Sequence, residues 1–302
     1  MTRLFVVVLA AAALAGGLAP AVHARGAAIG IGDQKASMFD DTRFRTLGIR
    51  FARLTVAWDA LSHEWQRTEI DQWMAAARRA NVDPLVTFGH SRTDRRSLPT
   101  PSRFKFEFRR FRERYPWVDT YATWNEANHC GQPVCNRPAL VAAYYKAIRR
   151  ECRDCTVLAA ELLDMPNMVS WARRFTKAAG HEPEVWGLHN YVDTNRFRTT
   201  SSRDMLRAVK GKIWLTEVGG LVRRTSKTKV PLDESPTHAV RALKWLFREI
   251  IPMSDRFERV YIYHWSAGGP QENWDSALFT PGGRPREAYD IVKRQILSRR
   301  RA

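Results

Sequence analysis

The feature that most constrains the fold is a regular alternation of short apolar runs with helical patterns, which begins at residue 28. Eight runs rich in β-branched or aromatic residues start about 33 residues apart, and this period is typical of a strand followed by a helix. The runs are Ala28–Gly32, Phe51–Ala57, Pro84–Phe88, Thr120–Trp124, Thr156–Ala160, Glu184–Leu188, Lys212–Thr216 and Arg259–Tyr263. Several are apolar throughout, which indicates strands buried on both faces, as in a parallel sheet.

The segments between these runs carry the periodicity of amphipathic helices. Phe104, Phe108 and Phe111 recur at the i, i+4, i+7 spacing of a buried helix face, with arginines mostly on the other side. Ser235 followed by Pro236 matches a helix N-cap with proline in the first turn. The chain therefore alternates strands with helices.

Eight such units in about 275 residues predict an α/β protein with a (β/α)8 barrel, the TIM-barrel fold. We expect a single domain over residues 25–302, because no linker rich in Pro, Gly or Ser divides the chain. The main alternative is an open, doubly wound sheet. That fold requires a glycine-rich phosphate loop or a switch point in the strand order, and the sequence contains neither signal.

Residues 1–24 have the pattern of a secretory signal peptide. Arg3 precedes the apolar run Leu4–Leu18, and small residues up to Ala24 offer cleavage sites. A membrane anchor is the alternative, but glycines and a proline interrupt the run before the roughly 20 apolar residues that a span needs. We therefore expect a secreted protein of the cell exterior or envelope, with no membrane span in the mature chain.

Four cysteines form two close pairs, Cys130 with Cys135 and Cys152 with Cys155. In the cytosol such spacing could bind zinc through four thiolates, and four cysteines allow three different disulfide pairings. Because an oxidising compartment favours disulfides, we expect the two local bridges.

Functional side chains of a (β/α)8 barrel lie at the carboxyl ends of its strands. The chemistry-bearing residues at these positions are Arg53 and Trp58 (second strand), His90 (third), Asn125 and Glu126 (fourth), His189 and Tyr191 (sixth), Glu217 (seventh) and Trp265 (eighth). Asp33 and Glu161 follow the first and fifth strands and are weaker candidates. Packing alone does not explain so many polar and aromatic residues at one rim, so we expect a site there.

Two glutamates of this rim point to a reaction. Glu126 and Glu217 are 91 residues apart, close to three βα units, which places them on opposite sides of the barrel mouth. A retaining glycosidase needs two carboxyl groups about 5–5.5 Å apart, one protonated as the acid and one ionised as the nucleophile. Arg53 and Tyr191 near Glu217 would favour its ionised form, whereas a more enclosed Glu126 could hold the proton.

The motifs that carry these residues resemble those of the clan A retaining glycoside hydrolases. The similar segments are Trp124–Asn128, His189–Tyr191 and Thr216–Gly219, followed by an aromatic residue after the eighth strand and by Trp274–Leu278. Ala127 departs from the pattern, because many members have proline there, and this affects the rigidity of the loop more than the chemistry. Within the clan, the chain is similar to compact endo-β-1,3-glucanases and to β-xylosidase-like enzymes.

The resemblance implies a role for each matching residue. Glu126 would be the acid/base and Glu217 the nucleophile. The substrate-binding positions would be Asn125 on the sugar 2-hydroxyl, Tyr191 on the nucleophile, Trp265 as the platform under the sugar, and Arg53 and His90 in the same subsite. The implied activity is hydrolysis of β-linked oligo- or polysaccharides with retention of configuration, without a metal or an organic cofactor.

Other aromatic residues and the histidines leave more than one interpretation open. Trp58 and Trp274 could form outer subsites, because sugar rings stack on flat aromatic side chains. His90 and His189 could either bind substrate or be hydrogen-bonded histidines of the core.

The net charge of the chain is +18, and 39 of its 49 basic residues are arginine. The basic runs lack the interleaved aromatics of a nucleic-acid groove, so nucleic acid is not an expected partner. We expect a basic surface that associates with anionic polymers of the cell envelope, in addition to a carbohydrate substrate. The sequence also lacks the nucleophile elbow of serine hydrolases, the H-E-x-x-H zinc helix and the phosphate loop.

Two alternatives to an enzyme remain. One is a carbohydrate-binding protein that uses the same barrel without catalysis. The other is a basic protein that interacts with the cell envelope and whose pocket is vestigial.

Overall fold

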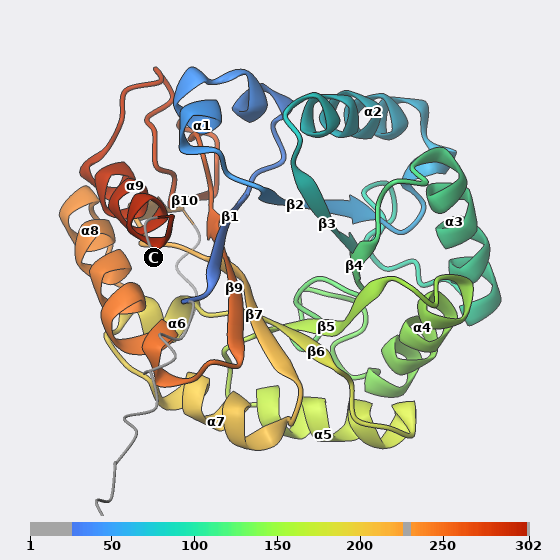
Figure 1. Ribbon diagram of the computed structural model, residues 1–302. Coiled ribbons are helices and arrows are strands. Elements are labelled where there is room, and N and C mark those ends of the chain that lie inside the picture. Colours follow the sequence, from blue (N-terminus) through green and yellow to red (C-terminus); the bar gives the residue numbers. More distant parts are fainter. Residues whose placement is uncertain (1–25, 226–230, 301–302) are drawn as a thin grey trace, which may run out of the picture.

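The computed structural model describes residues 26–225 and 231–300, and the predicted signal peptide lies outside them. Eight parallel strands close into a barrel (Figure 1), in the order β1 to β7 followed by β9. They are β1 (Ala28–Gly32), β2 (Phe51–Ala57), β3 (Asp83–Gly89), β4 (Thr120–Ala122), β5 (Thr156–Leu163), β6 (Val185–His189), β7 (Lys212–Val218) and β9 (Phe257–Tyr263). The predicted (β/α)8 barrel is confirmed.

Five strands differ in length from the prediction: β3, β7 and β9 are each two residues longer, and β4 and β5 differ at their carboxyl ends. The regular part of β4 ends at Ala122, although Thr123 N–H still donates to Leu158 and Asn125 N–H to Phe88. Strand β5 runs on to Leu163, with an irregularity in its pairing to β6 after Leu158. The chain therefore leaves the regular ladder where the functional motifs begin.

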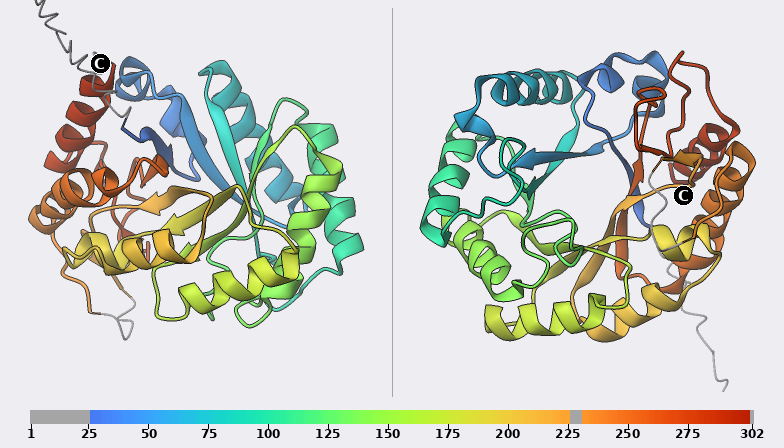
Figure 2. Two further views of the ribbon diagram at one scale, coloured as in Figure 1. Left: turned by 60° about the horizontal axis from the view of Figure 1, so that its bottom comes forward. Right: turned by 180° about the vertical axis from the view of Figure 1, so that it is seen from behind.

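The helices form a ring around the barrel, as the further views in Figure 2 also show. They are α1 (Thr42–Leu47), α2 (Glu64–Arg79), α3 (Pro101–Arg114), α4 (Pro138–Glu151), α5 (Met168–Ala179), α6 (Tyr191–Asn195), α7 (Thr200–Ala208), α8 (Pro236–Trp245) and α9 (Glu287–Arg299), with short helical turns η1 (Ala36–Asp40), η2 (Ala60–Ser62), η3 (Leu246–Ile250) and η4 (Ile251–Met253). A two-stranded ribbon, β8 (Arg223–Arg224) with β10 (Trp274–Asp275), lies outside the barrel.

The sequence signals for individual helices hold. The phenylalanine stripe of α3 is buried, and it packs around Phe88 of β3. Ser235 caps α8, because its side chain accepts the backbone N–H of His238 at 2.9 Å, and Pro236 is the first helical residue. Burial of one face, together with a cap that satisfies free N–H groups, fixes where these helices begin and how they face the barrel.

The interior of the barrel has two layers. We call the apolar cluster Leu85, Ala122, Leu158, Val185, Trp214 and Tyr261, with Phe51 packed against it, the lower layer. Side chains from β2, β3, β5 and β6 lie above it, toward the carboxyl ends of the strands. This upper layer consists of the hydrogen-bonded Arg53, Thr87, Glu161 and His189. The barrel is therefore filled below and carries charged groups above.

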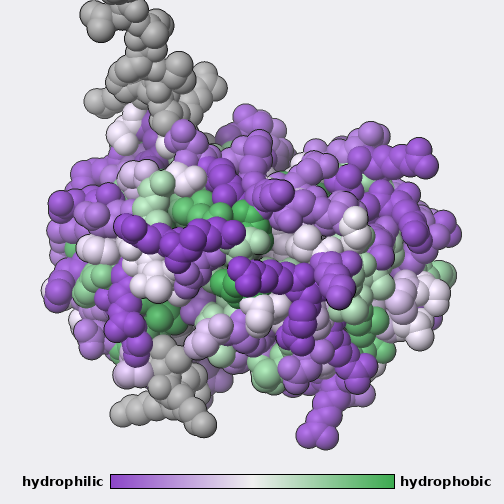
Figure 3. Space-filling model, turned by 90° about the horizontal axis from the view of Figure 1, so that it is seen from below, coloured by the Kyte–Doolittle hydropathy of each residue, from purple (hydrophilic) through white to green (hydrophobic). Residues whose placement is uncertain are grey.

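The cysteine pairs, the helices and the surface agree with the expectations from the sequence. Cys130 is bonded to Cys135 and Cys152 to Cys155, as expected. Over the described ranges, none of the helices has both the length and the apolar character that crossing a membrane requires. The face in Figure 3 is largely hydrophilic, with apolar side chains in small patches between the polar ones.

Candidate active site

Glu217, near the end of β7, is held by the two residues expected to lie near it. Its Oε2 accepts from Arg53 Nη1 at 2.8 Å, and its Oε1 accepts from the Tyr191 hydroxyl at 3.0 Å. Tyr191 begins helix α6 directly after β6, and burial together with the Glu217 charge raises its pKa. A phenol that keeps its proton can only donate to Glu217, so Arg53 and Tyr191 both direct hydrogens at the oxygens of this carboxyl group.

Arg53 of β2 is the centre of the charged network. Its Nε and Nη2 donate to the two oxygens of Glu161 at 2.8 and 2.5 Å, and Nη2 also donates to Asn125 Oδ1 at 2.7 Å. Arg53 is only 2% exposed, and the charges of Glu161 and Glu217 raise its pKa even though burial lowers it. The guanidinium of Arg53 is therefore buried against Glu217, Glu161 and Asn125, and its role in lining a substrate subsite stays a prediction.

Glu126 follows β4 and differs from the expectation. Its backbone has φ = 45°, in the left-handed region that non-glycine residues rarely adopt. The side chain is more exposed than that of Glu217 (23% against 16%), and its Oε1 lies 3.2 Å from His189 Nδ1. Burial raises the pKa of Glu126, but the hydrogen bond and charge of His189 outweigh it and lower the pKa. The expectation that enclosure alone would keep Glu126 protonated is therefore wrong.

His189 at the end of β6 lies between three carboxylates. Nδ1 faces Glu126 at 3.2 Å and Glu217 at 3.9 Å, and Nε2 faces Glu161 at 3.3 Å. Burial would lower the pKa of His189, but Glu217, Glu126 and Glu161 raise it to about 9. The side chain is fully buried. His189 is thus a buried member of the charged network, which agrees with the second of its two interpretations, a hydrogen-bonded histidine of the interior, rather than with direct contact to substrate.

The two glutamates are close enough to act on one bond. One oxygen of Glu126, one oxygen of Glu217 and a ring nitrogen of His189 all lie within 4.8 Å of one another. Such distances would also suit a metal ion. A cation would, however, have to displace the proton that His189 carries at neutral pH, so the set is better suited to proton transfer than to metal binding.

Trp265 does not lie at the barrel mouth, so its predicted role as the sugar platform is wrong. It is 2% exposed, and its ring packs against Phe44 of α1 and against Phe279 and Tyr289. Its indole N–H donates to Asp41 at 3.1 Å. Beyond the end of β9 the chain turns outward, which carries Trp265 under the helices.

Two other aromatic residues are near Glu217. Trp274 is half-buried and contacts Tyr191 edge-on, with ring centroids 4.7 Å apart. Tyr263, the last residue of β9, was missed; burial and the Glu217 charge raise its pKa. Inward-facing residues alternate along a strand, so Tyr263 shares the interior side with Tyr261 of the lower layer, and this alternation could have revealed it.

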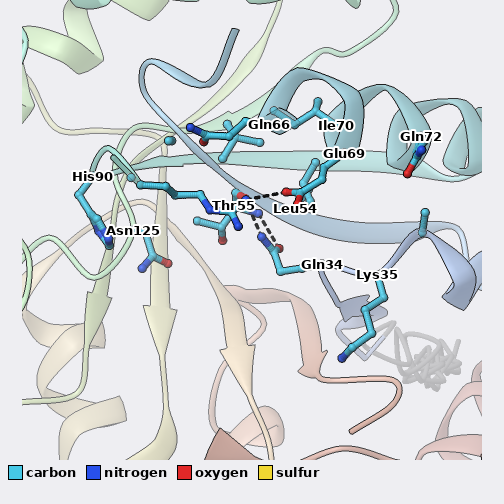
Figure 4. A pocket seen from close by; sticks show the side chains of 15 residues that line it. Gln34, Lys35, Leu54, Thr55, Gln66, Glu69, Ile70, Gln72, His90 and Asn125 are labelled. Carbon is cyan, nitrogen blue, oxygen red and sulfur yellow. Dashed lines mark hydrogen bonds and ion pairs between the residues drawn. The ribbon is translucent and has the colours of Figure 1, made fainter. Parts of the chain in front are cut away.

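A hollow of about 500 Å³ adjoins Asn125 and is lined by the loops after β1 and β3, by β2 and by α2. His90 and Asn125 lie at one end of it and Gln72 at the other (Figure 4). Gln34 spans the middle, where its side-chain amide pairs with the backbone of Thr55 at 2.7 and 3.0 Å. His90 is half-buried and binds Gln132, and burial lowers its pKa. The hollow could therefore receive a polar ligand against His90 and Asn125, whereas neither Glu126 nor Glu217 lines it.

The remaining candidates have different surroundings. Trp58 is half-buried and packs against the hydrophobic core, and its indole N–H has no hydrogen-bond partner among the described residues. Asp33 accepts the backbone N–H groups of Lys35, Trp265 and Ser266, so it fixes loops. Glu161, only a weak candidate by sequence, lies fully buried inside the network.

Comparison with known proteins shows the fold. No known family and no curated protein matches the sequence. A family 39 glycoside hydrolase from Bacteroides cellulosilyticus is similar in structure, with a TM-score of 0.57 and 15% identity over 91% of this chain and 64% of that chain. An endo-1,4-β-xylanase from Caldicellulosiruptor owensensis gives a TM-score of 0.60 at 13% identity, covering 89% of this chain and 97% of that one. Xylanase 10B from Thermotoga petrophila, in complex with xylobiose, gives 0.61 at 11% identity, covering 91% and 95%. What this chain shares with all three is the barrel.

Proposed function

We propose that the protein is a retaining glycoside hydrolase that cleaves β-linked oligo- or polysaccharides. The observation that carries the proposal is the short distance between Glu126 and Glu217. One carboxylate oxygen of Glu126 lies within 4.8 Å of one carboxylate oxygen of Glu217. A retaining pair stands about 5–5.5 Å apart, whereas an inverting pair needs about 6.5–9.5 Å to admit a water molecule. The barrel that the chain shares with a xylanase and a family 39 glycoside hydrolase supports the same reaction class.

The first step forms a covalent glycosyl-enzyme. Glu217 attacks the anomeric carbon while the bond from that carbon to the leaving oxygen breaks, and Glu126 delivers a proton to that oxygen. Arg53 and Tyr191 hold the attacking carboxylate in place. Asn125, whose Oδ1 is bound to Arg53, has no partner for its amide NH2 among the described residues, so this group is placed to bind the sugar.

The second step reverses the proton transfer. Glu126 removes a proton from water as the water oxygen attacks the anomeric carbon and Glu217 leaves. Between turnovers the proton is shared by His189 Nδ1 and Glu126 Oε1 across 3.2 Å. Trp274 and Tyr263 replace Trp265 as the aromatic surfaces for the sugar.

We further propose that the protein is exported by cleavage after residues 1–24 and acts outside the cell or in its envelope. The two disulfides support this location, because such bridges persist in oxidising compartments. The net charge of +18 supports an association with anionic envelope polymers.

The test uses two variants and an activated aryl glycoside. Glu217→Ala should lower kcat by at least about 10⁴-fold, because no covalent intermediate can form. Glu126→Ala should accept azide and release a glycosyl azide of retained configuration, because azide needs no general base. A screen of β-glucans and xylans with chromatography of the products would identify the substrate.

Other outcomes would reject the proposal. Normal rates in both variants would show that Glu126 and Glu217 are not the catalytic pair. Saturable glycan binding by the wild-type protein without release of sugar would indicate a carbohydrate-binding protein instead. An inverted product, read from the anomeric proton signals in NMR, would exclude the covalent mechanism.

A further inference from the structure

Glu161 is a buried carboxylate whose hydrogen-bonding capacity is completely used. Oε1 accepts from Arg53 Nε at 2.8 Å and from Thr87 Oγ1 at 2.9 Å. Oε2 accepts from Arg53 Nη2 at 2.5 Å and lies 3.3 Å from His189 Nε2. A carboxylate has about four lone-pair positions, so all of them face groups of the described network. The side chain has no exposed surface and cannot reach a substrate.

The contacts of Glu161 decide which ring nitrogen of His189 carries hydrogen. Arg53 Nη2 has two hydrogens, and they go to Glu161 and to Asn125. None remains for His189 Nε2, although the two nitrogens are only 3.3 Å apart. Nε2 must therefore itself donate to Glu161, because an ionised carboxylate is an acceptor only. This leaves Nδ1 directed at Glu126.

The neighbouring strand leaves space for this arrangement. Gly187 of β6 is the register partner of Glu161. A Cβ atom at position 187 would lie 2.6 Å from Glu161 Cγ and 3.0 Å from Thr216 Oγ1. A glycine therefore stands where the Glu161 side chain passes, and any larger residue would displace it.

We propose that Glu161 is a positioning residue for both halves of the catalytic pair, because it keeps hydrogen on His189 Nε2, which leaves Nδ1 facing Glu126, and it orients the Arg53 guanidinium toward Glu217. The inference rests on the function proposed above and deepens it. Glu161 forms and breaks no bond in the reaction. Its charge and its four hydrogen bonds preorganise the groups that do.

The charged groups around His189 determine how the pH dependence of kcat/KM should change when Glu161 loses its charge. They are Arg53 from β2, Glu126 after β4, Glu161 from β5 and Glu217 from β7. Removing the charge of Glu161 removes one of the carboxylates that favour the imidazolium, so His189 loses its proton at lower pH. The alkaline limb of kcat/KM should move down accordingly.

The first experiment leaves every residue of the charged network unchanged. Nitrogen-15 NMR of histidine-labelled, ligand-free protein reports whether each ring nitrogen of His189 carries hydrogen, with Gly187→Ala as a perturbation that preserves the charge of Glu161. We expect Nε2 to remain protonated from pH 6 to 10 while Nδ1 loses its hydrogen. A neutral His189 with hydrogen on Nδ1 would overturn the proposal.

The second experiment compares Glu161→Gln with Glu107→Gln. Glu107 of α3 is also buried (3% exposed) and bound by two arginines, Arg103 and Arg110, but it lies outside the site. Glu161→Gln should lower kcat about 100-fold, the size of effect that a small misplacement of reacting groups produces, and shift the alkaline limb down by at least about one pH unit. It should also move hydrogen from Nε2 to Nδ1, because the Gln amide donates where the carboxylate accepted. Glu107→Gln should leave the rate and the pH profile unchanged.

The outcomes separate this inference from the proposed function. If Glu217→Ala abolishes turnover while Glu161→Gln keeps the wild-type rate and pH profile, the positioning role is wrong and the glycosidase mechanism stands. If Glu217→Ala is fully active, the proposed function itself fails. Glu161→Asp retains the charge and should restore the alkaline limb even where kcat stays low; the same shift in Glu161→Asp as in Glu161→Gln would contradict the electrostatic role.

Discussion

The two layers of the barrel interior are filled in opposite ways, the lower by apolar side chains and the upper by charged ones. The lower layer is apolar, with Leu158 and Tyr261 fully buried, and it excludes water through close packing. The upper layer buries Arg53, Glu161 and His189, whose desolvation is offset by contacts with one another and with the polar groups around them. The lower layer therefore supplies stability, and the upper layer supplies oriented charge at a cost in stability.

Arginines in the two halves show the difference most directly. Arg259, at the lower end, stacks over the rings of Phe51 and Trp214, with its guanidinium carbon 4.2 and 4.0 Å from their centroids. Arg53 is surrounded by carboxylates and an amide instead. The same side chain thus closes an apolar core in one place and orients acidic groups in the other.

The largest effect is expected from Arg53→Gln. Removing this cation leaves His189 as the remaining cation against Glu161 and Glu217 in the described network, which should lower the free energy of unfolding by about 3–5 kcal/mol. Activity should fall by at least about 10³-fold, because the nucleophile loses its partner. Chemical denaturation and aryl-glycoside kinetics measure the two effects. The matched control is Arg259→Gln, which should keep its activity; equal loss of activity in both variants would erase the distinction between the layers.

Leu158→Ala tests the lower layer by itself. Truncating a fully buried leucine should lower the free energy of unfolding by about 2–5 kcal/mol, because it loses apolar burial and leaves a cavity. The kcat of the folded protein at low temperature should remain that of the wild type. A large fall in kcat with unchanged stability would show that the lower layer also positions the catalytic groups.

The pH dependence of stability should carry the signature of the upper layer. The folded protein raises the pKa of His189 to about 9, so it binds that proton more tightly than the unfolded chain, whose histidine pKa is about 6.5. The resulting stabilisation is fully present below about pH 6.5 and is lost as the pH rises through about 9, by no more than about 3 kcal/mol. Denaturation between pH 6 and 10 measures it, and His189→Gln should remove this slope. An identical slope in that variant would assign it to other groups.

The smallest effect concerns the aromatic residues beside the upper layer. Trp274→Ala should raise KM about tenfold, equivalent to about 1.4 kcal/mol, because the sugar loses one stacking surface. Trp117, a half-buried tryptophan on the core of another part of the barrel, offers the control. Trp117→Ala should leave KM unchanged, whereas an equal rise in both variants would exclude a specific role for Trp274.

The sequence was sufficient for the strands and for the acidic pair. Both ends of β1 and of β2 were predicted to the residue, because an apolar run between turn signals leaves little choice of strand boundary. Glu126 and Glu217 were expected at one rim because parallel strands in a barrel all end on the same side.

The sequence predicted the orientation of side chains less well than it predicted the strands. Trp265 and Tyr263 are two positions apart, yet the chain turns between them, so one is core and the other lies near Glu217. Glu161 was expected to be only a weak candidate, yet it contacts both Arg53 and His189 in the charged network. Its contact with His189 joins the adjacent strands β5 and β6 at residues 28 positions apart in sequence, and no local pattern records such a contact.

What the sequence determined by itself was the number and spacing of the βα units, the presence of two glutamates at the same rim and the large excess of arginine. Periodicity and strand polarity are local properties, and burial of apolar faces converts them directly into a closed barrel. Only the tertiary structure decided where the proton of the site is held, because a pKa depends on every charge within a few ångströms. Arg53, Glu161 and His189 come from three different strands, and their shared environment exists only once the barrel has closed.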